Sequence, residues 1–543
     1  MRRVVSLLFV LGFLAVSGIA RAADSVVNEQ GAAVLKKQIE ESVQWRIDMA
    51  KSVGQGLTLG GDIEVAPKGS FYEVNLPQVS VLRGPQVKLD IGTVIVNATP
   101  GAAGEWQTQV TFPSTMTLTD TSKAMTAQIT IGEQRFSGVW WPEKDIYAQV
   151  DSLYQNIQIR GSGEGGLALT IGSFKSNVDM KENSDGTWSG PLDFDVNDIR
   201  ADVTGKKTAH FEIAKIFSHS AYDRLDMRQT QKFKKDLQNL MKPGQPPNEK
   251  DVQALMKETL SRSPISIEGM KSAFEISGML FRENNPDPAQ PPREFSLDKA
   301  TFLADTSGMQ QEKSKILLIT GFSGLKSSFM PADFAGLLPD GFNAEIRIDN
   351  LPAKRIMETM LGALQQSLQT AGDVKNAPEA GRVAAEKAFS DARYSIPKMM
   401  QEAGTSLTVQ NTFTKSAEID TSLNGQITAD AAAVLGATGK MTFSVRGMDE
   451  TLQKLQAAAI KPGADPQLMG YVGGLTGFQM AGQITSSADG KTMRNYVLEL
   501  SPDGTVLMNG TPLPFPMMGM GKAQPESAPA PVVLPQSTPA PTP

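Results

Sequence analysis

The sequence predicts a β-rich α+β fold in which extended antiparallel sheet carries helices packed on one of its sides. Short runs in which every second residue is apolar fill much of the chain between residues 57 and 196. Turn signals such as Pro67-Lys68-Gly69 and Ser184-Asp185-Gly186 separate these runs. Farther along, a strand followed by a helical hairpin and more strand recurs three times. Such a pattern is typical of a large antiparallel sheet or a sandwich.

The first residues have the parts of an export signal. Arg2 and Arg3 form a basic start, residues 4–19 are almost all apolar, and residues 20–22 have the small-x-small pattern of a cleavage site. As a helix the apolar run would measure about 24 Å, less than the roughly 30 Å of a bilayer core. We therefore expect a signal peptide over residues 1–22, cleavage between Ala22 and Ala23, no transmembrane span in the mature chain, and a periplasmic location.

The region after the signal begins with a helix and continues as strands. Val34, Leu35, Ile39, Val43 and Ile47 recur at helical spacing and predict an amphipathic helix. Beyond residues 54–56 the apolar period changes to two. The strands predicted from this alternation lie near residues 57–65, 72–76, 87–96, 107–112, 126–131, 136–140, 157–160, 167–171 and 192–196.

The rest of the chain repeats one order of elements. FEIAKIFSHSAYDRL (residues 211–225) has the pattern of a strand that runs into a helix, with a second helix beyond a proline-rich break. The order recurs at AEIRIDNLPAKRIMETM, with a second helix from Pro378, and at MTFSVRGMDETLQKLQ, with a second helix from Pro466. Strand is expected to resume at Phe478 and Met480. The recurrence indicates one unit, strand–helical hairpin–strand, stacked along a growing sheet.

We expect four regions in the chain. These are the signal peptide (1–22), an N-terminal helix plus β-rich region that ends in a helical hairpin (23–250), a β-rich region with two further strand–helical hairpin units (251–514), and a disordered tail rich in Pro, Ala and Met (515–543). The hairpin RNYVLELSPDGTVLMNG, with a Pro502-Asp503-Gly504 turn, is expected to end the sheet.

Composition excludes several classes of function. The formal net charge of −6 argues against a nucleic-acid-binding protein, and the absence of cysteine excludes disulfides and thiolate metal sites. The two histidines, His210 and His219, even with Asp223 and Asp226 nearby, supply too few ligands at too wide a spacing for zinc. GSGEGG (161–166) matches a dinucleotide fingerprint in letters, but a strand pattern follows it where the motif needs a helix. We expect no metal and no cofactor.

Two surface features could mark an interface. Trp140 and Trp141 are adjacent on a predicted strand, so their rings point to opposite faces. One of them is expected in the core, and the other needs a second buried face, a partner or a lipid interface. Basic residues between Arg224 and Lys235 lie on a predicted amphipathic helix, a type that can lie on anionic membranes but more often covers its own sheet.

The closing segment YVLELSPDGTVLMNGTPLP resembles the C-terminus of YdgA-like proteins, and the repeated strand–Leu/Met–helix corners resemble theirs too. These are large proteobacterial envelope proteins of unknown function, loosely related to AsmA-like proteins. The resemblance covers about the last two thirds of the chain. It implies an exported, non-catalytic protein of extended sheet, and it carries over no active residues. YdgA-like proteins tend to keep their N-terminal apolar segment as an anchor, whereas this chain has a cleavage site.

The function expected from these observations is binding without catalysis. A sheet with helices on one side can hold lipid, or another envelope component, against alternate apolar strand residues. The partner would be a lipid or an envelope protein, and the oligomeric state stays open. The alternative is a secreted hydrolase of envelope polymers that uses paired carboxylates, for which Asp193, Asp195 and Asp198 are available.

Overall fold

The computed structural model describes residues 26–228 and 266–513, together with Lys232, Asp236, Leu255 and Glu258. Short gaps lie at 53–54, 85, 102–103, 143, 145, 163–165, 205–207, 285–289, 331, 374–377, 462–465 and 487–489. The predicted signal peptide with its cleavage site, most of the predicted first helical hairpin and the predicted tail lie outside these residues.

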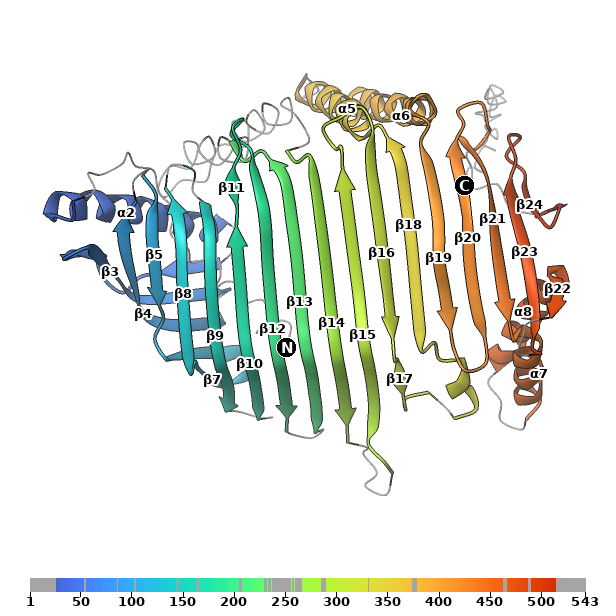
Figure 1. The fold of residues 1–543 in the computed structure, drawn as a ribbon, viewed down its shortest axis with the longest axis horizontal. Helices are drawn as coiled ribbons and strands as arrows, with labels where there is room; N and C mark the ends of the chain where they lie inside the picture. The colour runs from blue at the N-terminus through green and yellow to red at the C-terminus, as the bar shows by residue number, and fades with distance from the viewer. Residues whose placement is uncertain are drawn as a thin grey trace, which may run out of the picture.

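One sheet runs through the whole described part of the chain, and Figure 1 shows it as a single broad layer. It has 25 strands in the described residues, and neighbouring strands are antiparallel. β13 and β14 pair directly, with Ile216 opposite Ile276. The sheet therefore continues on both sides of the predicted boundary at residues 250 and 251.

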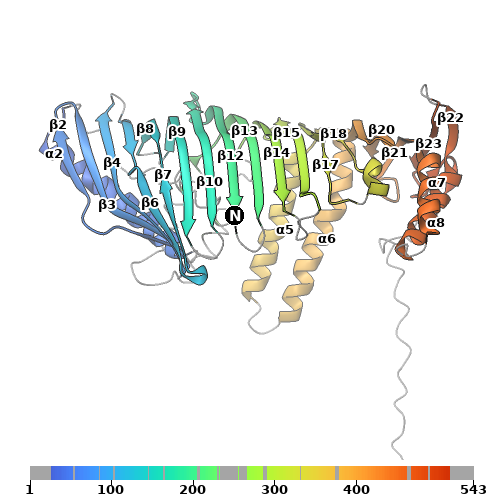
Figure 2. The ribbon, with the colours of Figure 1, turned by 90° about the horizontal axis from the view of Figure 1, so that it is seen from below.

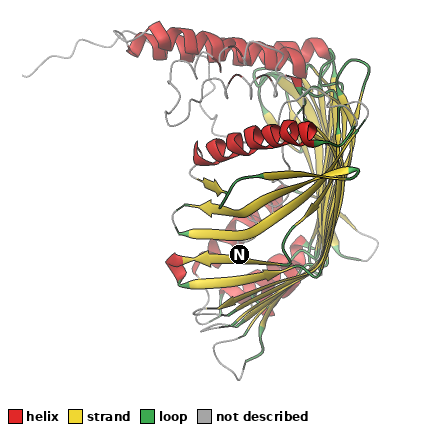
Figure 3. Ribbon diagram, turned by 90° about the vertical axis from the view of Figure 1, so that its left-hand side faces the viewer, coloured by secondary structure: helices red, strands yellow, loops and turns green. Residues whose placement is uncertain are grey.

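The N-terminal region curls over itself and holds the largest core. It comprises α2 (Glu29–Ser52), β1 (Gln55–Thr58), β2 (Glu64–Lys68), β3 (Phe71–Arg83), β4 (Val87–Pro100), β5 (Trp106–Thr111), β6 (Thr115–Asp120), the short helix η1 (Thr121–Lys123), β7 (Met125–Thr130) and β8 (Glu133–Trp141). β4 pairs with β5 near one end and with β6 near the other, and β9 then pairs with both β8 and β7. This fork bends the strands around α2, as Figure 3 shows.

The middle of the sheet is made of the longest strands. They are β9 (Ile146–Ser162), β10 (Leu167–Asp179), β12 (Trp188–Val203), β13 (Ala209–Leu225), β14 (Gly269–Glu283) and β15 (Arg293–Ser307), with the short β11 (Lys181–Glu182) beside β12. GSGEGG (161–166) is followed by strand β10, as its sequence predicted, and Gly161 lies opposite Leu167; residues 163–165 of the motif lie outside the described residues.

Two helical hairpins interrupt the C-terminal strands. The order is β16 (Ser314–Ser323), β17 (Lys326–Ser327), η2 (Ala332–Leu337), β18 (Gly341–Leu351), α5 (Ala353–Asp373), α6 (Pro378–Ala403), β19 (Ser406–Lys415), β20 (Asp420–Ala429), β21 (Ala437–Arg446), α7 (Met448–Ala459), α8 (Pro466–Ala481), β22 (Gln483–Ser486), β23 (Thr492–Leu500), β24 (Val506–Met508) and β25 (Thr511–Pro512). In Figure 2, α2, α5, α6, α7 and α8 all lie on the same side of the sheet.

A line of kinks crosses the long strands. Asn156 on β9, Asp198 on β12 and Gly278 on β14 all have positive φ, at 53°, 54° and 61°. In the strand register they face Gly172 on β10 and Ala214 on β13. A Cβ on Gly172 would lie 2.8 Å from the Cβ of Asp198, so the glycine makes room for its kinked neighbour. Asparagine, aspartate and glycine are the residues that adopt this backbone conformation most readily.

The kinks change the phase of the side chains. Tyr154 and Ile157, on either side of Asn156, both line the same cavity although they are three residues apart. On β13 the same break separates Ile213, which is buried, from Ile216, which packs against the main core. This explains why the prediction of a helix within residues 211–225 was wrong: the segment is strand throughout, and the kink gives its apolar residues a helix-like spacing of three.

The predicted strand at Phe478 and Met480 was also wrong. Both residues lie in α8, and strand resumes only at β22. Phe478 stacks on Tyr496 of β23, with ring centroids 4.3 Å apart. An apolar alternation of three residues is too short to distinguish a strand from a helix end, and packing onto the sheet decides the outcome. The final hairpin was predicted correctly, with β23 and β24 paired around the Pro502–Gly504 turn.

Candidate functional site: an apolar cavity that continues as an apolar sheet face

The helix α2 covers the curled strands through one apolar stripe. Leu35, Ile39 and Val43 are buried there. At the start of the helix, the backbone N–H of Asn28 donates to Tyr72 Oη over 3.1 Å, and the backbone N–H of Gly31 donates to Asn28 Oδ1 over 2.8 Å. The side chain of Asn28 therefore satisfies a donor of the first turn, which has no partner within the helix.

An apolar cavity of about 540 Å³ lies between α2 and the sheet. Its wall starts at Val43 and Arg46 on α2 and extends across the strands as far as Leu192 on β12 and Tyr222 on β13. The volume falls within the range of roughly 300–1,000 Å³ that is usual for sites of small organic ligands. The lining is mainly aliphatic and aromatic, so it suits a ligand with a long apolar part.

Aromatic rings mark the direction in which the cavity continues. Four rings form a chain of contacts, with centroids 6.2, 5.9 and 5.1 Å apart: Phe112 just after β5, Tyr154 on β9, Phe174 on β10 and Phe194 on β12. Burial raises the pKa of Tyr154, which agrees with its position among apolar groups. The chain of rings leads from the core of the N-terminal region onto the central strands.

From there the same side of the sheet stays apolar across the following strands. Phe194 faces Ser218, Ser218 faces Phe274, and Phe274 faces Phe302, so all four side chains share one face. We call this the apolar face. On β10 to β21 it includes Phe174, Phe194, Ile216, Phe274, Phe302, Leu318, Phe322, Phe342, Ile346, Leu407, Val409, Leu423, Met441 and Phe443.

The middle of the apolar face is open. Phe274 is 39% exposed and Phe302 is 44% exposed, although both belong to the central strands of the sheet. A phenylalanine in the centre of a sheet is normally covered by a second layer. These two rings therefore remain partly exposed on a face that is otherwise lined by apolar side chains.

The C-terminal end of the apolar face is closed by α7 and α8. Tyr496 is fully buried and donates its hydroxyl to the carbonyl oxygen of Phe478 over 3.1 Å. Beside it, Arg494 binds Asp449 of α7 through Nε at 2.6 Å and Nη2 at 3.0 Å. The hydrogen bond from Arg494 lowers the pKa of Asp449. This bidentate pair fixes the helix to the sheet.

The opposite face of the sheet carries several ion pairs. Lys215 pairs with Asp195 at 3.1 Å, Lys299 with Glu275 at 2.7 Å, and His219 with Asp193 at 2.5 Å. Of the three aspartates that the hydrolase alternative would use, Asp193 and Asp195 thus pair with basic residues on this face. The third, Asp198, is the residue with positive φ at the kink of β12. Their neighbours along the strand have the other orientation, so these charged side chains lie on the face opposite the apolar face, which also carries Leu303 and Leu317.

The two adjacent tryptophans differ in burial. Trp140 is buried and lies opposite Trp106. Trp141 is half-buried, with Lys144 Nζ 4.5 Å from the centre of its ring and 5.2 Å from that of Trp188. The second tryptophan is thus covered in part by a cation–π contact within the chain.

The two histidines do not meet. The ring of His210 lies between two carboxylates, with Nδ1 2.7 Å from Asp202 Oδ1 and Nε2 2.9 Å from Glu212 Oε1. His219, farther along β13, contacts Asp193 of β12. The hydrogen bond to Asp202 raises the pKa of His210, with a further contribution from Glu212. Within the described ranges there is no group of three or more residues that could hold a metal ion.

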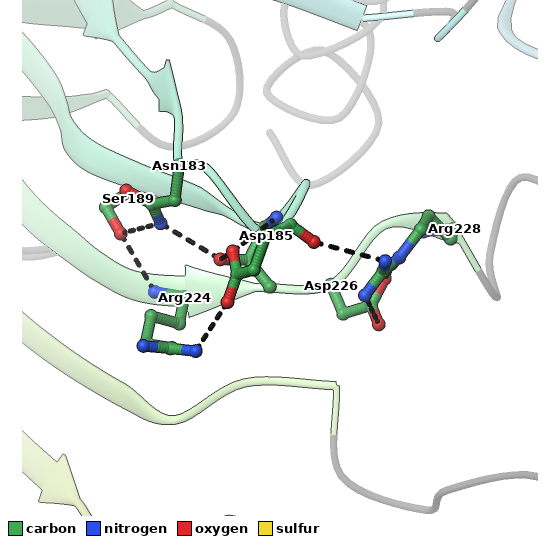
Figure 4. Close-up of polar contacts among 7 residues, drawn as sticks. Asn183, Asp185, Ser189, Arg224, Asp226 and Arg228 are labelled. Carbon is green, nitrogen blue, oxygen red and sulfur yellow. Dashed lines mark hydrogen bonds and ion pairs between the residues drawn. The ribbon is translucent and has the colours of Figure 1, made fainter.

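A polar cluster at the end of β13 brings carboxylates and arginines together (Figure 4). Asp185 accepts hydrogen bonds from the backbone N–H and Oγ1 of Thr187, at 3.0 and 2.6 Å, and forms an ion pair with Arg224. Asp226 binds Arg228 through Nε at 2.9 Å and Nη2 at 2.8 Å. Arg228 Nη1 also donates to the backbone carbonyl of Asp185 over 3.2 Å. The cluster ties the end of β13 to the turn before β12.

The electrostatics of these acids suit ion pairing. Hydrogen bonds from neighbouring side chains lower the pKa of Asp185, Asp226, Glu345 and Asp449. The general acid of a glycosidase needs the opposite, a carboxyl whose pKa is raised. These carboxylates are therefore poor candidates for acid–base work.

Several functional candidates could not be found from the sequence. The exposure of Phe274 and Phe302 depends on the uncovered layer above them, which no local pattern reports. Arg46 is one of several charged residues on α2, and only its place in the cavity wall distinguishes it from the others. The alternation of apolar residues on β14 and β15 did predict which side chains share a face. It was the one sequence pattern that could have pointed to Phe274 and Phe302.

The chain was also compared with known proteins. No family model, no curated protein and no solved structure matches it. Among the described helices, none is long and apolar enough to cross a bilayer.

Proposed function

We propose that the protein is a non-catalytic periplasmic binding protein that holds the acyl chains of a lipid against its sheet. The observation that carries the proposal is the open middle of the apolar face, where Phe274 and Phe302 are partly exposed. The face is continuous in register with a cavity of about 540 Å³ at the N-terminal end. Acyl chains bound there would be removed from water, which is the main driving force for such binding.

The helices form the walls of the binding surface in this proposal. In Figure 2 the helices all lie on one side of the sheet, and the α5–α6 hairpin projects away from it. Phe478 of α8 contacts Phe443, with ring centroids 5.9 Å apart, so this is the side of the apolar face. We interpret α5–α6 and α7–α8 as two copies of the repeated unit, each following a strand and preceding the next one. Stacking such units would lengthen the apolar face without changing its chemistry.

The hydrolase is the weaker alternative. Asp193 and Asp195 lie on the face opposite the apolar face and pair with His219 and Lys215, and neither lines the cavity. A polymer-cleaving site would instead need two carboxylates in a cleft, one of them with a raised pKa. No observation favours this function over lipid binding.

Lipids that accompany the protein from its own compartment provide the test. The mature chain would be purified from a periplasmic extract without detergent, extracted with organic solvent, and analysed by mass spectrometry. We expect acyl lipids in at least stoichiometric amount. Phe274→Glu places a charge on the apolar face and should reduce the bound lipid, whereas Ala273→Glu, one residue away on the opposite face, should not. Lipid-free wild-type protein that also hydrolyses an envelope glycan would support the alternative.

A further inference from the structure

Two serine hydroxyls interrupt the apolar lining of the cavity. Ser152 on β9 lies directly opposite Ser176 on β10, and both line the cavity. Directly opposed residues of an antiparallel strand pair have Cβ atoms about 4.5–5.5 Å apart, so the two hydroxyls belong to one small part of the wall. Ser152 is only 3% exposed, which places its hydroxyl in the interior rather than at the rim.

The two hydroxyls have no hydrogen-bond partner among the described residues. A second pair of opposed serines differs in this respect, because Ser220 on β13 and Ser272 on β14 are joined by a hydrogen bond of 3.0 Å. Burying a hydroxyl without a partner costs free energy. The cavity wall therefore offers a polar position that a ligand can complete.

Apolar residues line the cavity on both sides of this serine pair. Toward one end, Ile157 and Ile171 are directly opposed and buried. Toward the other end, Val150 and Val178 are directly opposed and half-buried, so the cavity is more enclosed at the isoleucines than at the valines. A ligand oxygen that meets the serines therefore has carbon atoms on both sides of it, and it lies within a chain rather than at its tip.

The strand geometry gives the position of this oxygen along the chain. Ser176 and Ile171 are five residues apart on β10, which corresponds to roughly 16 Å at about 3.3 Å per residue. An extended chain advances roughly 1.2 Å per bond, since a residue of three backbone bonds spans at most about 3.3–3.6 Å. The oxygen therefore lies roughly 13 bonds from the methyl end of a chain that reaches Ile171.

We propose that the cavity binds an acyl chain that carries a hydroxyl group, with this hydroxyl between Ser152 and Ser176 and the methyl end beside Ile157 and Ile171. The inference rests on the proposed function and specifies its ligand. A serine hydroxyl can both donate and accept a hydrogen bond. The ligand hydroxyl can therefore accept a hydrogen bond from one serine and donate one to the other, which satisfies all three groups. A plain acyl chain would cover both serine hydroxyls without giving either of them a partner.

Displacement of a fluorescent acyl probe by three octadecanoic acids tests the proposal. The protein purified from the periplasm would be freed of bound lipid and titrated with octadecanoic acid, with its 5-hydroxy derivative, whose hydroxyl has the required distance from the methyl end, and with its 18-hydroxy derivative. We expect the wild-type protein to bind the 5-hydroxy acid about 10-fold more tightly than octadecanoic acid, as expected for two hydrogen bonds between neutral groups. The 18-hydroxy acid should bind more weakly than octadecanoic acid, because its hydroxyl would lie among the isoleucines.

Serine variants identify the residues that hold the hydroxyl. Ser152→Ala should reduce the preference for the 5-hydroxy acid to about threefold, and the double variant with Ser176→Ala should abolish the preference while the affinity for octadecanoic acid is kept. Ser173→Ala removes a hydroxyl of β10 that accepts a hydrogen bond from Asn197 over 3.1 Å and is not part of the described lining, so it should keep the wild-type preference. Unfolding in urea checks that each variant remains folded.

The results separate this inference from the general proposal. Equal affinity for octadecanoic acid and its 5-hydroxy derivative would overturn the assignment of a hydroxylated chain and leave lipid binding standing. Equal affinity for the 5-hydroxy and 18-hydroxy acids, or a preference that survives in the double variant, would overturn the placement of the hydroxyl at the serines. If none of the three acids displaces the probe, both proposals fail.

Discussion

Phe302→Ser removes the most exposed aromatic ring of the apolar face. The ring is 44% exposed, and a phenylalanine side chain offers roughly 200 Å² of surface, so a ligand could cover about 90 Å² of it. At about 25 cal/mol per Å², covering this area contributes about 2 kcal/mol to binding. The loss of the ring should therefore weaken acyl-chain binding about 30-fold.

A fluorescent acyl probe titrated into the mature protein measures this loss. The matched control is Leu303→Ser, which removes an apolar side chain of the same strand from the opposite face. The control should bind the probe as the wild-type protein does, and unfolding in urea shows whether both variants remain folded. Equal losses in the two variants would refute the assignment of the apolar face, as would full affinity in Phe302→Ser.

Three further predictions concern the framework of the site. Gly278→Ala should lower the free energy of unfolding by about 2 kcal/mol, because the residue has a φ of 61° and its new Cβ would lie 2.6 Å from a neighbouring side chain. The control Gly362→Ala, at a helix position with open space, should raise the free energy of unfolding by about 0.5–1 kcal/mol. If urea unfolding gave changes of the same sign for the two variants, the kink would be contradicted. Asp449→Ala should cost about 3 kcal/mol at pH 7. Since its arginine partner lowers the folded pKa of Asp449, this stabilisation is complete above the unfolded value of about 3.9 and is lost as pH falls through the folded value. A difference in unfolding free energy between wild type and variant that does not shrink as the pH is lowered would be inconsistent with the pair. For His210, a hydrogen bond to the Asp202 carboxylate raises the pKa of the folded state. The stabilisation that His210 contributes to the fold is therefore complete below about pH 6.5 and is lost as pH rises through the folded pKa. An NMR titration of the ring that gives a pKa below about 6.5 would contradict this prediction.

The elements that depend on local pattern were predicted well. The helix at Val34–Ile47 became α2, Pro378 and Pro466 start α6 and α8, and the closing hairpin has its expected turn. These succeed because a 3.6-residue period, a proline at the first helical position and an Asp-Gly turn each act within a few residues. The large antiparallel sheet followed from the number of alternating runs.

The errors came from long-range structure. The prediction of a helix inside β13 was wrong because Ala214 lies on the line of kinks that crosses the strands. The residues with positive φ on this line, such as Asp198 and Gly278, belong to the neighbouring strands. Nothing in the local sequence of β13 reports this. The candidate site also depends on residues that are distant in the sequence. Arg46 and Phe302 stand out only because of the elements that surround them in the fold. The alternation of apolar and polar residues predicted which side chains of a strand share a face. It did not predict which face of the sheet is left uncovered.

Photo-crosslinking in the living cell tests the central claim most directly. A benzoyl-phenylalanine would replace Phe274, Phe302 or Phe322 on the apolar face, and Leu303 or Leu317 on the opposite face, and mass spectrometry of the irradiated, purified protein would identify the adducts. If the apolar face holds acyl chains, lipid adducts should form at the three phenylalanine positions and be absent from the two leucine positions. Lipid adducts distributed equally over both faces, or protein adducts alone at the three phenylalanine positions, would contradict the account.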